Sequence, residues 1–190
     1  MRQYVNGNWV ATDGPYAKTG FIPIPLTALR EIISNDIPTR SDTELTDIAT
    51  KGTGVLSKTS TPQFEYVNGD TDSAMRLEWA SSNGDPVAFN TPLPPDVDTS
   101  SAIELHVVAA MGGATDTPVF DLDTFFNVAD TKVSDATAAV TGTTVAEYTA
   151  TIAAADIPTL PWVVNIEMTP GAHTTDALYL YAVWLEYTKI

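Results

Sequence analysis

The chain ends in the stretch DALYLYAVWLEYTKI, residues Asp176–Ile190, which is apolar on both sides of a strand. In a half-buried strand successive side chains alternate between core and solvent, so one of the two sets should be polar. Here the odd positions from 177 to 187 are Ala, Tyr, Tyr, Val, Leu and Tyr, and the even positions from 178 to 184 are Leu, Leu, Ala and Trp. We expect one face to pack on a sandwich core. The other, Tyr-bearing face should be covered by the N-terminal segment or by a second subunit.

Seven more segments upstream have β-strand character and are separated by turn signals rich in Gly, Pro, Asp and Ser. The eight expected strands are 63–68, 74–80, 86–90, 102–111, 118–128, 144–152, 161–169 and 177–188. Their connectors are too short for crossover helices, which argues against a parallel α/β sheet. The sequence therefore predicts an all-β fold, with residues 61–190 forming an eight-stranded antiparallel sandwich of jelly-roll type. An immunoglobulin-like strand order stays open.

Residues 1–60 differ in character, because Pro and Gly are scattered through short apolar pieces. Pro23 and Pro25 disfavour pairing inside a sheet, and residues 26–33 are long enough for two helical turns. Residues 41–50 have the Ser41 and Glu44 spacing of a capping box, which favours a second short helix. We expect an extended N-terminal arm carrying short helical turns.

Composition excludes several kinds of partner. The chain has 190 residues and a formal net charge of -15, whereas nucleic-acid binding requires clustered Lys and Arg. No apolar run approaches the length of about 20 residues that spans a bilayer. The N-terminus lacks an apolar run of signal-peptide length, so we expect it to be retained. We expect a soluble protein that binds neither nucleic acid nor membranes.

Nucleophilic and zinc chemistry have little support. The chain has no Cys, two His and no G-x-S-x-G motif. His106 alternates with apolar residues, which favours a packed or sheet-surface histidine over an acid–base catalyst. His173 lies in the loop PGAHTTD, which favours a hydrogen-bonding role within that loop. We expect no enzymatic activity, no catalytic residues, no metal and no cofactor.

Two aspartate pairs are the remaining candidates for calcium. Asp70 and Asp72 lie in NGDTDS, and Asp96 and Asp98 lie in PPDVD. Each pair offers oxygen atoms at alternate positions, but NGDTDS lacks the Glu that closes an EF-hand loop. We favour solvated turns, in which Asp supports the turn geometry.

The tryptophans fall into two groups. Trp79, Trp162 and Trp184 lie in expected strands, which favours core or interface roles over a sugar-binding platform. Trp9 lies in the arm near Tyr4 and Tyr16, where no local core is available to bury it. We expect Trp9 to dock against another surface.

Two long stretches, DPVAFNTPLPPDVDTSSAIELHVVAAMGG (85–113) and PGAHTTDALYLYAVWLEYTKI (170–190), resemble a family of small β-sandwich virion proteins of tailed bacteriophages. The PLPPD turn, the strand after it and the terminal strand carry the resemblance. It covers residues 60–190 and, more loosely, IPIPLTALREI (22–32). It implies a jelly-roll capsid decoration or cement protein.

The resemblance implies a structural role on the outer surface of the capsid. The partner would be the phage major capsid protein, and the chain would form a homo-oligomer, with a trimer favoured. We expect eight aromatic or aliphatic side chains of the arm and the terminal strand to bind such partners: Tyr4, Trp9, Phe21, Ile22, Ile24, Tyr179, Tyr181 and Tyr187.

Two other functions compete with this one. A jelly roll can present aromatic platforms or acidic loops to sugars, so the chain would serve as a carbohydrate- or receptor-binding module of a phage tail or head fibre. A glycoside hydrolase or lyase on the same sandwich has only abundant acidic residues in its favour.

Overall fold

The computed structural model describes residues 2–5, 8–11, 19–34, 51–58, 60–68, 73–127 and 131–190. These residues form fourteen strands and two three-residue 3-10 helices. The strands are β1 (Arg2–Val5), β2 (Asn8–Ala11), β3 (Thr19–Ile24), β4 (Arg30–Ser34), β5 (Lys51–Val55), β6 (Gln63–Asn68), β7 (Ser73–Trp79), β8 (Val87–Pro92), β9 (Ile103–Met111), β10 (Phe120–Phe126), β11 (Val133–Ala136), β12 (Ala146–Ile152), β13 (Val163–Pro170) and β14 (Leu178–Thr188). The helices are η1 (Leu26–Ala28) and η2 (Ala154–Asp156). None of the described helices is long and apolar enough to cross a membrane.

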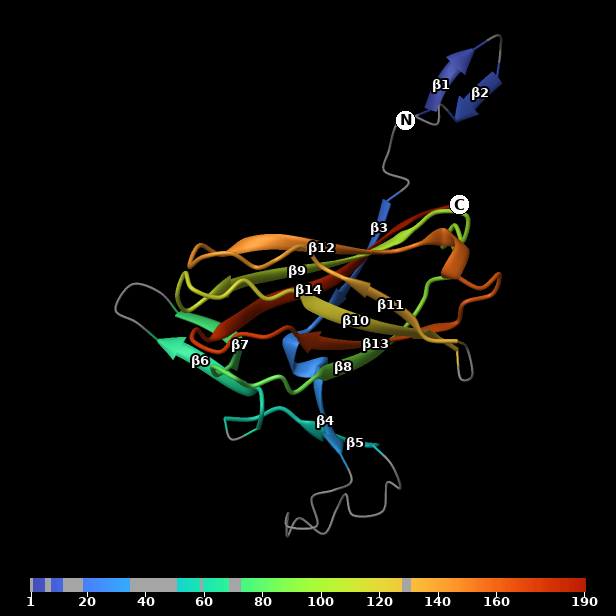
Figure 1. The fold of residues 1–190 in the computed structure, drawn as a ribbon. Helices are drawn as coiled ribbons and strands as arrows, with labels where there is room; N and C mark the ends of the chain where they lie inside the picture. Colours follow the sequence, from blue (N-terminus) through green and yellow to red (C-terminus); the bar gives the residue numbers. More distant parts are fainter. Residues whose placement is uncertain are drawn as a thin grey trace.

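Twelve of the strands form a sandwich of two antiparallel sheets (Figure 1). Sheet I has the order β11-β10-β13-β8-β4-β5. Sheet II has the order β12-β9-β14-β7-β6, and β3 pairs with the second half of β14. The predicted two-sheet antiparallel sandwich is confirmed. β1 and β2 pair with each other in a separate hairpin.

Strands β7 to β14 have the order of a jelly roll. Sheet II contains the run β7-β14-β9-β12, and sheet I contains β8-β13-β10-β11. Consecutive strands therefore alternate between the layers until β10, and the last strand lies between the first and the third, as two interleaved Greek keys require. This order excludes the immunoglobulin-like alternative.

All eight predicted strands are present, with ends that differ by at most two residues. Four further strands in the two sheets were not predicted: β3, β4, β5 and β11. Three of them lie within residues 1–60, so part of this segment adds to the sandwich. The division into a 1–60 arm and a 61–190 domain stays a prediction.

The helix expected over residues 26–33 is wrong. Only η1 is helical there, and β4 follows it at Arg30. The side chain of Leu29 between them is fully buried, and β4 pairs with β5 and β8. Burial and strand pairing thus override the local preference for a helix. The helix expected over residues 41–50 lies outside the described residues.

The terminal strand β14 is not a regular strand with a Tyr face. It pairs with β9 along its length, but the register shifts between Leu180 and Ala182. Such a bulge changes which set of side chains faces inward. The buried residues are accordingly Leu178 and Leu180 before the shift, and Val183, Leu185 and Tyr187 after it. The expectation of one continuous Tyr face is therefore wrong, whereas its covering by the arm or a second subunit stays a prediction. β3 lies at the edge of β14 and pairs with it there.

The core between the sheets is large and continuous. Trp79 and Phe120 are fully buried and meet edge to face, with ring centroids 5.7 Å apart. The indole of Trp79 donates a hydrogen bond to the backbone oxygen of Asp85, 2.8 Å away. The core role expected for Trp79 is confirmed.

Two aspartate side chains connect two loops at one end of the sandwich by hydrogen bonds to backbone N–H groups. The Asp176 carboxylate accepts hydrogen bonds from the backbone N–H groups of Thr115 and Asp116, at 2.6 and 3.1 Å. The Asp116 carboxylate accepts from those of Thr175 and Asp176, at 2.6 and 2.8 Å. The pKa of Asp116 is lowered, chiefly by the hydrogen bond from the Asp176 backbone and then by that from Thr175.

The substitution Gly20→Ala should destabilise the sandwich, because a methyl group at this position would overlap the Tyr187 ring. Overpacking of this kind costs about 1–3 kcal/mol of unfolding free energy. The matched control is Gly84→Ala, where a methyl group meets nothing within 4 Å. Urea unfolding measures both variants. Equal stabilities would contradict the close approach of Tyr187.

The substitution Asp116→Asn should lower stability at neutral pH and have little effect in strong acid. A lowered folded-state pKa means that the carboxylate contributes stability above its unfolded pKa of about 3.9, and that this contribution disappears as the pH falls through the folded-state pKa. Urea unfolding of variant and wild type at neutral and acid pH tests this. A loss of the same size at both pH values would contradict the charge-assisted role.

Candidate binding groove

The candidate site lies on the outer face of sheet I, where three strands place one row of side chains. The β8–β13 register pairs Asn90 with Asn165, and the β13–β10 register pairs Asn165 with Phe125. These three positions alternate with the buried Phe89, Ile166 and Phe126. Period-two alternation therefore turns an aromatic ring and two planar amides to the same outer face.

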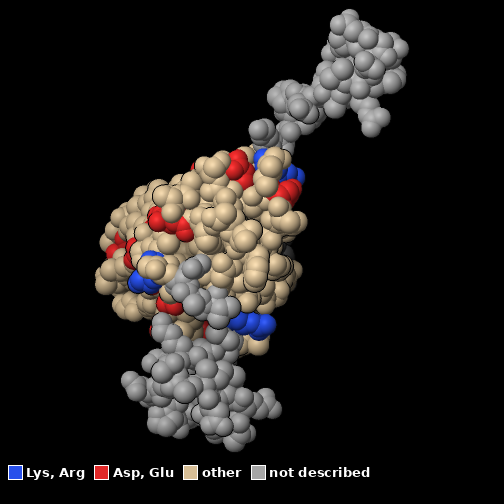
Figure 2. Space-filling view, turned by 90° about the vertical axis from the view of Figure 1, so that its right-hand side faces the viewer, with Lys and Arg blue, Asp and Glu red and all other residues tan. Residues whose placement is uncertain are grey.

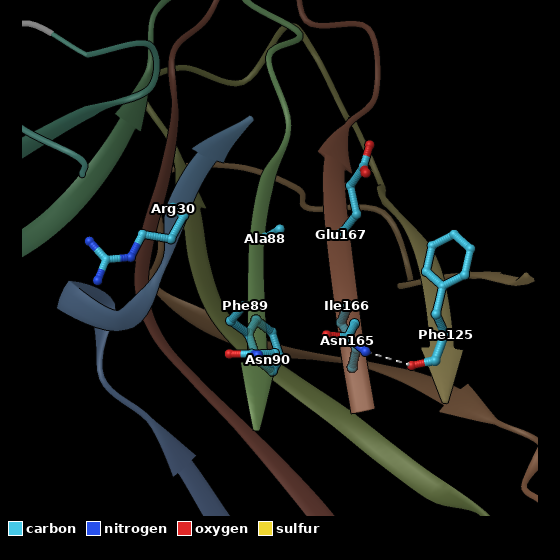
Figure 3. Close-up of a pocket in the computed structure, with 8 residues that line it drawn as sticks. All are labelled: Arg30, Ala88, Phe89, Asn90, Phe125, Asn165, Ile166 and Glu167. Atoms are coloured by element: carbon cyan, nitrogen blue, oxygen red, sulfur yellow. Dashed lines mark hydrogen bonds between the residues drawn. The ribbon is translucent and has the colours of Figure 1, made fainter. Parts of the chain in front are cut away.

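A hollow of about 370 Å³ opens along this row (Figure 3). Its lining consists of Arg30, Ala88, Phe89, Asn90, Phe125, Asn165, Ile166 and Glu167. The next row of the sheet places Ala88 between Arg30 of β4 and Glu167 of β13. Because Ala88 carries only a methyl group between two long side chains, the surface is low there. Pockets that bind small molecules have volumes from roughly 300 Å³ upward. This hollow is therefore large enough for one.

The backbone fixes the orientation of Asn165. Its Nδ2 donates to the carbonyl oxygens of Phe125, at 3.5 Å, and Asn127, at 3.4 Å. The amide oxygen therefore points the opposite way, toward the strand that carries Asn90 (Figure 3). Both bonds are long. They nevertheless hold an acceptor in place in the groove, so less side-chain entropy is lost when a ligand binds.

Asn127 links the groove to a neighbouring loop. It has a positive φ of 54°, a conformation that Asn tolerates better than most residues. Its side chain accepts from the backbone N–H of Trp162 at 2.9 Å and donates to the backbone oxygen of Leu160 at 3.3 Å. Trp162 is 74% exposed. The structure therefore excludes a core role for it and leaves the expected interface role as a prediction.

The outer face of sheet II also carries aromatic residues, but their ring faces are occupied. The guanidinium of Arg76 lies 3.7 Å from the centroid of the Tyr179 ring and is bonded to Glu65 and Glu78, both at 3.2 Å. The ring of Trp184 is stacked on His106, with centroids 4.9 Å apart and planes 5° apart. The Phe125 ring has no such aromatic or cationic partner among the described residues. Of these three rings, Phe125 is the one available for stacking.

His106 is buried beneath three carboxylates on sheet II. Its Nδ1 lies 2.7 Å from Glu147, and its Nε2 lies 3.6 Å from Glu104 and 3.5 Å from Glu186. Among the described residues, however, no group of three or more His, Cys, Asp or Glu side chains is arranged to hold a metal ion. The cluster fits the packed, sheet-surface histidine predicted from the sequence.

Charged groups on sheet II are partly desolvated. Burial raises the pKa of Glu78, and the neighbouring Glu65 raises it further, against the opposite effect of Arg76. Burial likewise raises the pKa of the Tyr179 hydroxyl. These shifts accompany a network of ion pairs within the sheet surface.

A second, more polar hollow of about 550 Å³ lies between β11 and the η2 segment. Its lining consists of Thr131, Lys132, Val133, Ser134, Ala155, Asp156, Ile157 and Pro158. It contains no aromatic side chain. The sheet I groove combines a ring with two amides, of which Asn165 is oriented by backbone carbonyls. It is therefore the better candidate for a specific ligand.

The structure separates the residues predicted to bind partners. Ile24 and Tyr187 are buried in the core, and Ile22 packs against it. Phe21 is 60% exposed, and Tyr179 and Tyr181 are half-buried on sheet II. The backbone register pairs Tyr4 with Trp9, but their side chains lie outside the described residues. The partner-binding role of this set stays a prediction.

Three of the loop residues singled out in the sequence have hydrogen-bond partners within the chain. His173 is buried, and its Nδ1 donates to the backbone oxygen of Gly171 at 2.8 Å, as expected for a loop role. Asp98 accepts hydrogen bonds from the backbone and side chain of Ser100, at 3.0 and 2.6 Å, which is Asx-turn geometry. Asp96 accepts from the Tyr187 hydroxyl at 3.2 Å. Asp70 and Asp72 lie outside the described residues.

Sequence reasoning did not single out the groove. Asn90, Asn165 and Phe125 are far apart in the chain and belong to no motif. Their common signal is a polar or aromatic residue at the outward position of a predicted strand, but that signal also fits an ordinary solvated face. The row becomes visible only when the strand order and register are known.

Comparisons with known proteins find no matching family model and no matching curated protein. Solved structures of similar shape include a xylan-binding module, CBM15, at 9% identity and a TM-score of 0.47, with 90% of this chain and 98% of that chain covered. A CBM61 module in complex with β-1,4-galactotriose has 9% identity and a TM-score of 0.41, covering 90% of this chain and 88% of that one. The CBM22-1 and GH10 modules of xylanase 10B from Clostridium thermocellum have 14% identity and a TM-score of 0.43, with 70% of this chain and 25% of that chain covered.

The expected resemblance to capsid decoration proteins is corrected by these comparisons. The similar structures named above contain carbohydrate-binding β-sandwich modules and are not decoration proteins. The inferred function as a capsid cement protein is wrong for the same reason. The expected location on the virion, the major capsid protein as partner and the homo-oligomer stay predictions. The likenesses concern overall shape only and do not show what this chain binds.

Proposed function

We propose that this chain is a carbohydrate-binding β-sandwich module that holds a glycan in the groove of sheet I without cleaving it. A pyranose ring carries C–H groups on its faces and hydroxyl groups around its rim. A binding site therefore needs an apolar surface for a face and fixed donors and acceptors for the rim. The row provides the ring of Phe125, an oriented acceptor on Asn165 and the exposed amide of Asn90, and this row is the observation that carries the proposal.

The polar groups of the groove suit hydroxyl recognition. An amide side chain both donates and accepts, as a sugar hydroxyl does, so Asn90 is able to exchange its bonds to water for bonds to a ligand. Asn165 uses its two N–H groups on backbone carbonyls and offers its amide oxygen as an acceptor. Asn165 is already oriented by two backbone carbonyls, and Asn90 is exposed at the neighbouring position. Such a site favours a polyhydroxylated ligand over an apolar one.

The same groove is poorly suited to glycoside hydrolysis, which requires two carboxyl groups flanking the scissile bond. The lining contains one carboxylate, Glu167. Its register partner on β10 is Asp123, whose carboxylate is bonded to Lys132 Nζ at 3.0 Å and to the Ser134 hydroxyl at 2.8 Å. We therefore favour binding over the hydrolase alternative.

The substitutions Phe125→Ala and Asn165→Ala should each weaken glycan binding, because they remove the stacking surface and the oriented amide. The loss for Phe125→Ala should be at least about tenfold, or roughly 1.4 kcal/mol, as for other central aromatic contacts. Isothermal titration calorimetry against a panel of β- and α-linked neutral oligosaccharides measures this. Reducing-sugar release in the same mixtures should stay at background.

The matched control is Tyr179→Phe on sheet II, which keeps the ring beneath Arg76 and lies outside the groove. It should bind as wild type does. Binding to no glycan in the panel would overturn the proposed function. Binding that survives Phe125→Ala and Asn165→Ala unchanged would move the site away from sheet I.

A further inference from the structure

We infer that Asn165 determines the specificity of the groove by requiring one ligand hydroxyl that donates a hydrogen bond. The groove would then select glycans in which this hydroxyl is free over glycans in which an ether, an ester or fluorine replaces it. The inference rests on the proposed glycan-binding function. It adds the hydrogen-bond role of one ligand position, since an Asn side chain that turns freely is able to serve a donor or an acceptor.

Two backbone carbonyls decide which end of the Asn165 amide faces the ligand. A carbonyl oxygen only accepts, so the end of the amide that lies 3.5 Å from the oxygen of Phe125 and 3.4 Å from that of Asn127 is the NH2 group. The amide oxygen Oδ1 is left on the other side, toward the strand of Asn90 (Figure 3). Turning the amide over would replace two hydrogen bonds by two contacts between oxygen atoms.

The bonds around Asn127 stabilise this orientation. Its backbone N–H donates to the oxygen of Val163 at 2.9 Å. Its side chain accepts from the N–H of Trp162 at 2.9 Å and donates to the oxygen of Leu160 at 3.3 Å. These three bonds connect Asn127 to the segment that leads into β13, and they hold its carbonyl in place beside Asn165.

Asn90 places a different requirement on a ligand. It lies opposite Asn165 in the register of β8 and β13, and it is exposed. Its side chain has no hydrogen bond with any of the residues that the structure describes. The amide of Asn90 is therefore able to turn and to serve either a donor or an acceptor. Only Asn165 distinguishes a free hydroxyl from its substituted forms.

Charge does not make this distinction. The groove lining contains one basic and one acidic side chain, Arg30 and Glu167, whereas a hydroxyl, an ether and a fluoride are all neutral. On the described part of the side shown in Figure 2, charged residues likewise stand at separate places among uncharged ones. Hydrogen bonding at Asn165 is therefore the interaction that differs between these ligands.

The loss of the donor has a direct cost. Asn165 is half-buried before any ligand binds, so a ligand in the groove excludes much of the remaining water from Oδ1. A free hydroxyl replaces the lost bond to water. An ether, an ester or fluorine has no proton to donate and leaves the acceptor unpaired, which is how sites built for a hydroxyl reject analogues that lack it.

The test uses deoxy and deoxyfluoro analogues of the oligosaccharide that binds most tightly in the panel, changed at one hydroxyl at a time. At one position both analogues should bind at least about fivefold more weakly than the parent by calorimetry, because neither is able to donate. This penalty should disappear in Asn165→Ala. It should remain in the matched variant Asn90→Ala, which removes the adaptable amide on the neighbouring strand. Variants that bind too weakly for calorimetry are ranked by competition with a fluorinated reference sugar, followed by fluorine NMR.

Three outcomes separate the inference from the proposed function. Deoxyfluoro analogues that bind as tightly as the parent at every position would contradict the inference and leave glycan binding intact. A penalty that persists in Asn165→Ala, or that disappears equally in Asn90→Ala, would also contradict it. Failure of every unmodified oligosaccharide to bind would instead overturn the proposed function.

Discussion

The register shift in β14 is the constraint on which the rest of the sandwich depends. A strand with strict alternation would turn either Leu178 and Leu180 or Val183 and Leu185 to the core, but not both pairs. The shift between Leu180 and Ala182 allows both pairs to be buried. β14 is also central in sheet II, because it pairs with β9 on one edge and with β7 and β3 on the other. The bulge in this central strand therefore explains why both the odd and the even positions of the terminal segment are apolar.

The two outer faces of the sandwich differ in a way that decides where a ligand is expected. On sheet II the ring of Tyr179 lies under Arg76, and Trp184 is stacked on His106. In these contacts the faces of the two rings are occupied by a guanidinium and an imidazole from the chain itself. On sheet I the Phe125 ring stands beside an oriented amide and above a hollow created by the small Ala88. An open ring with fixed polar neighbours is the property of a recognition surface, since affinity depends on preorganised contacts more than on area.

The sequence was informative wherever local alternation determined the outcome. It predicted the eight strands and the sandwich class, and the burial of Trp79 follows from its place in an alternating strand. It could not predict β3 and β4, because they become strands through pairing with β14 and β8, which are distant in the chain. For the same reason it missed the reciprocal bonds between the Asp116 and Asp176 loops. The groove was invisible for a related reason, since Asn90, Asn165 and Phe125 meet through register across three strands and not through any spacing along the chain.

The measurement that tests the central claim most directly is a titration of the isotope-labelled chain with neutral oligosaccharides, followed by nuclear magnetic resonance. The account predicts saturable chemical-shift changes in the side-chain amides of Asn90 and Asn165 and in the backbone amide of Phe125, with the Trp184 indole unaffected. Shifts concentrated at Trp184 and Tyr179 with a silent Asn165 would contradict it, because they would place the ligand on sheet II.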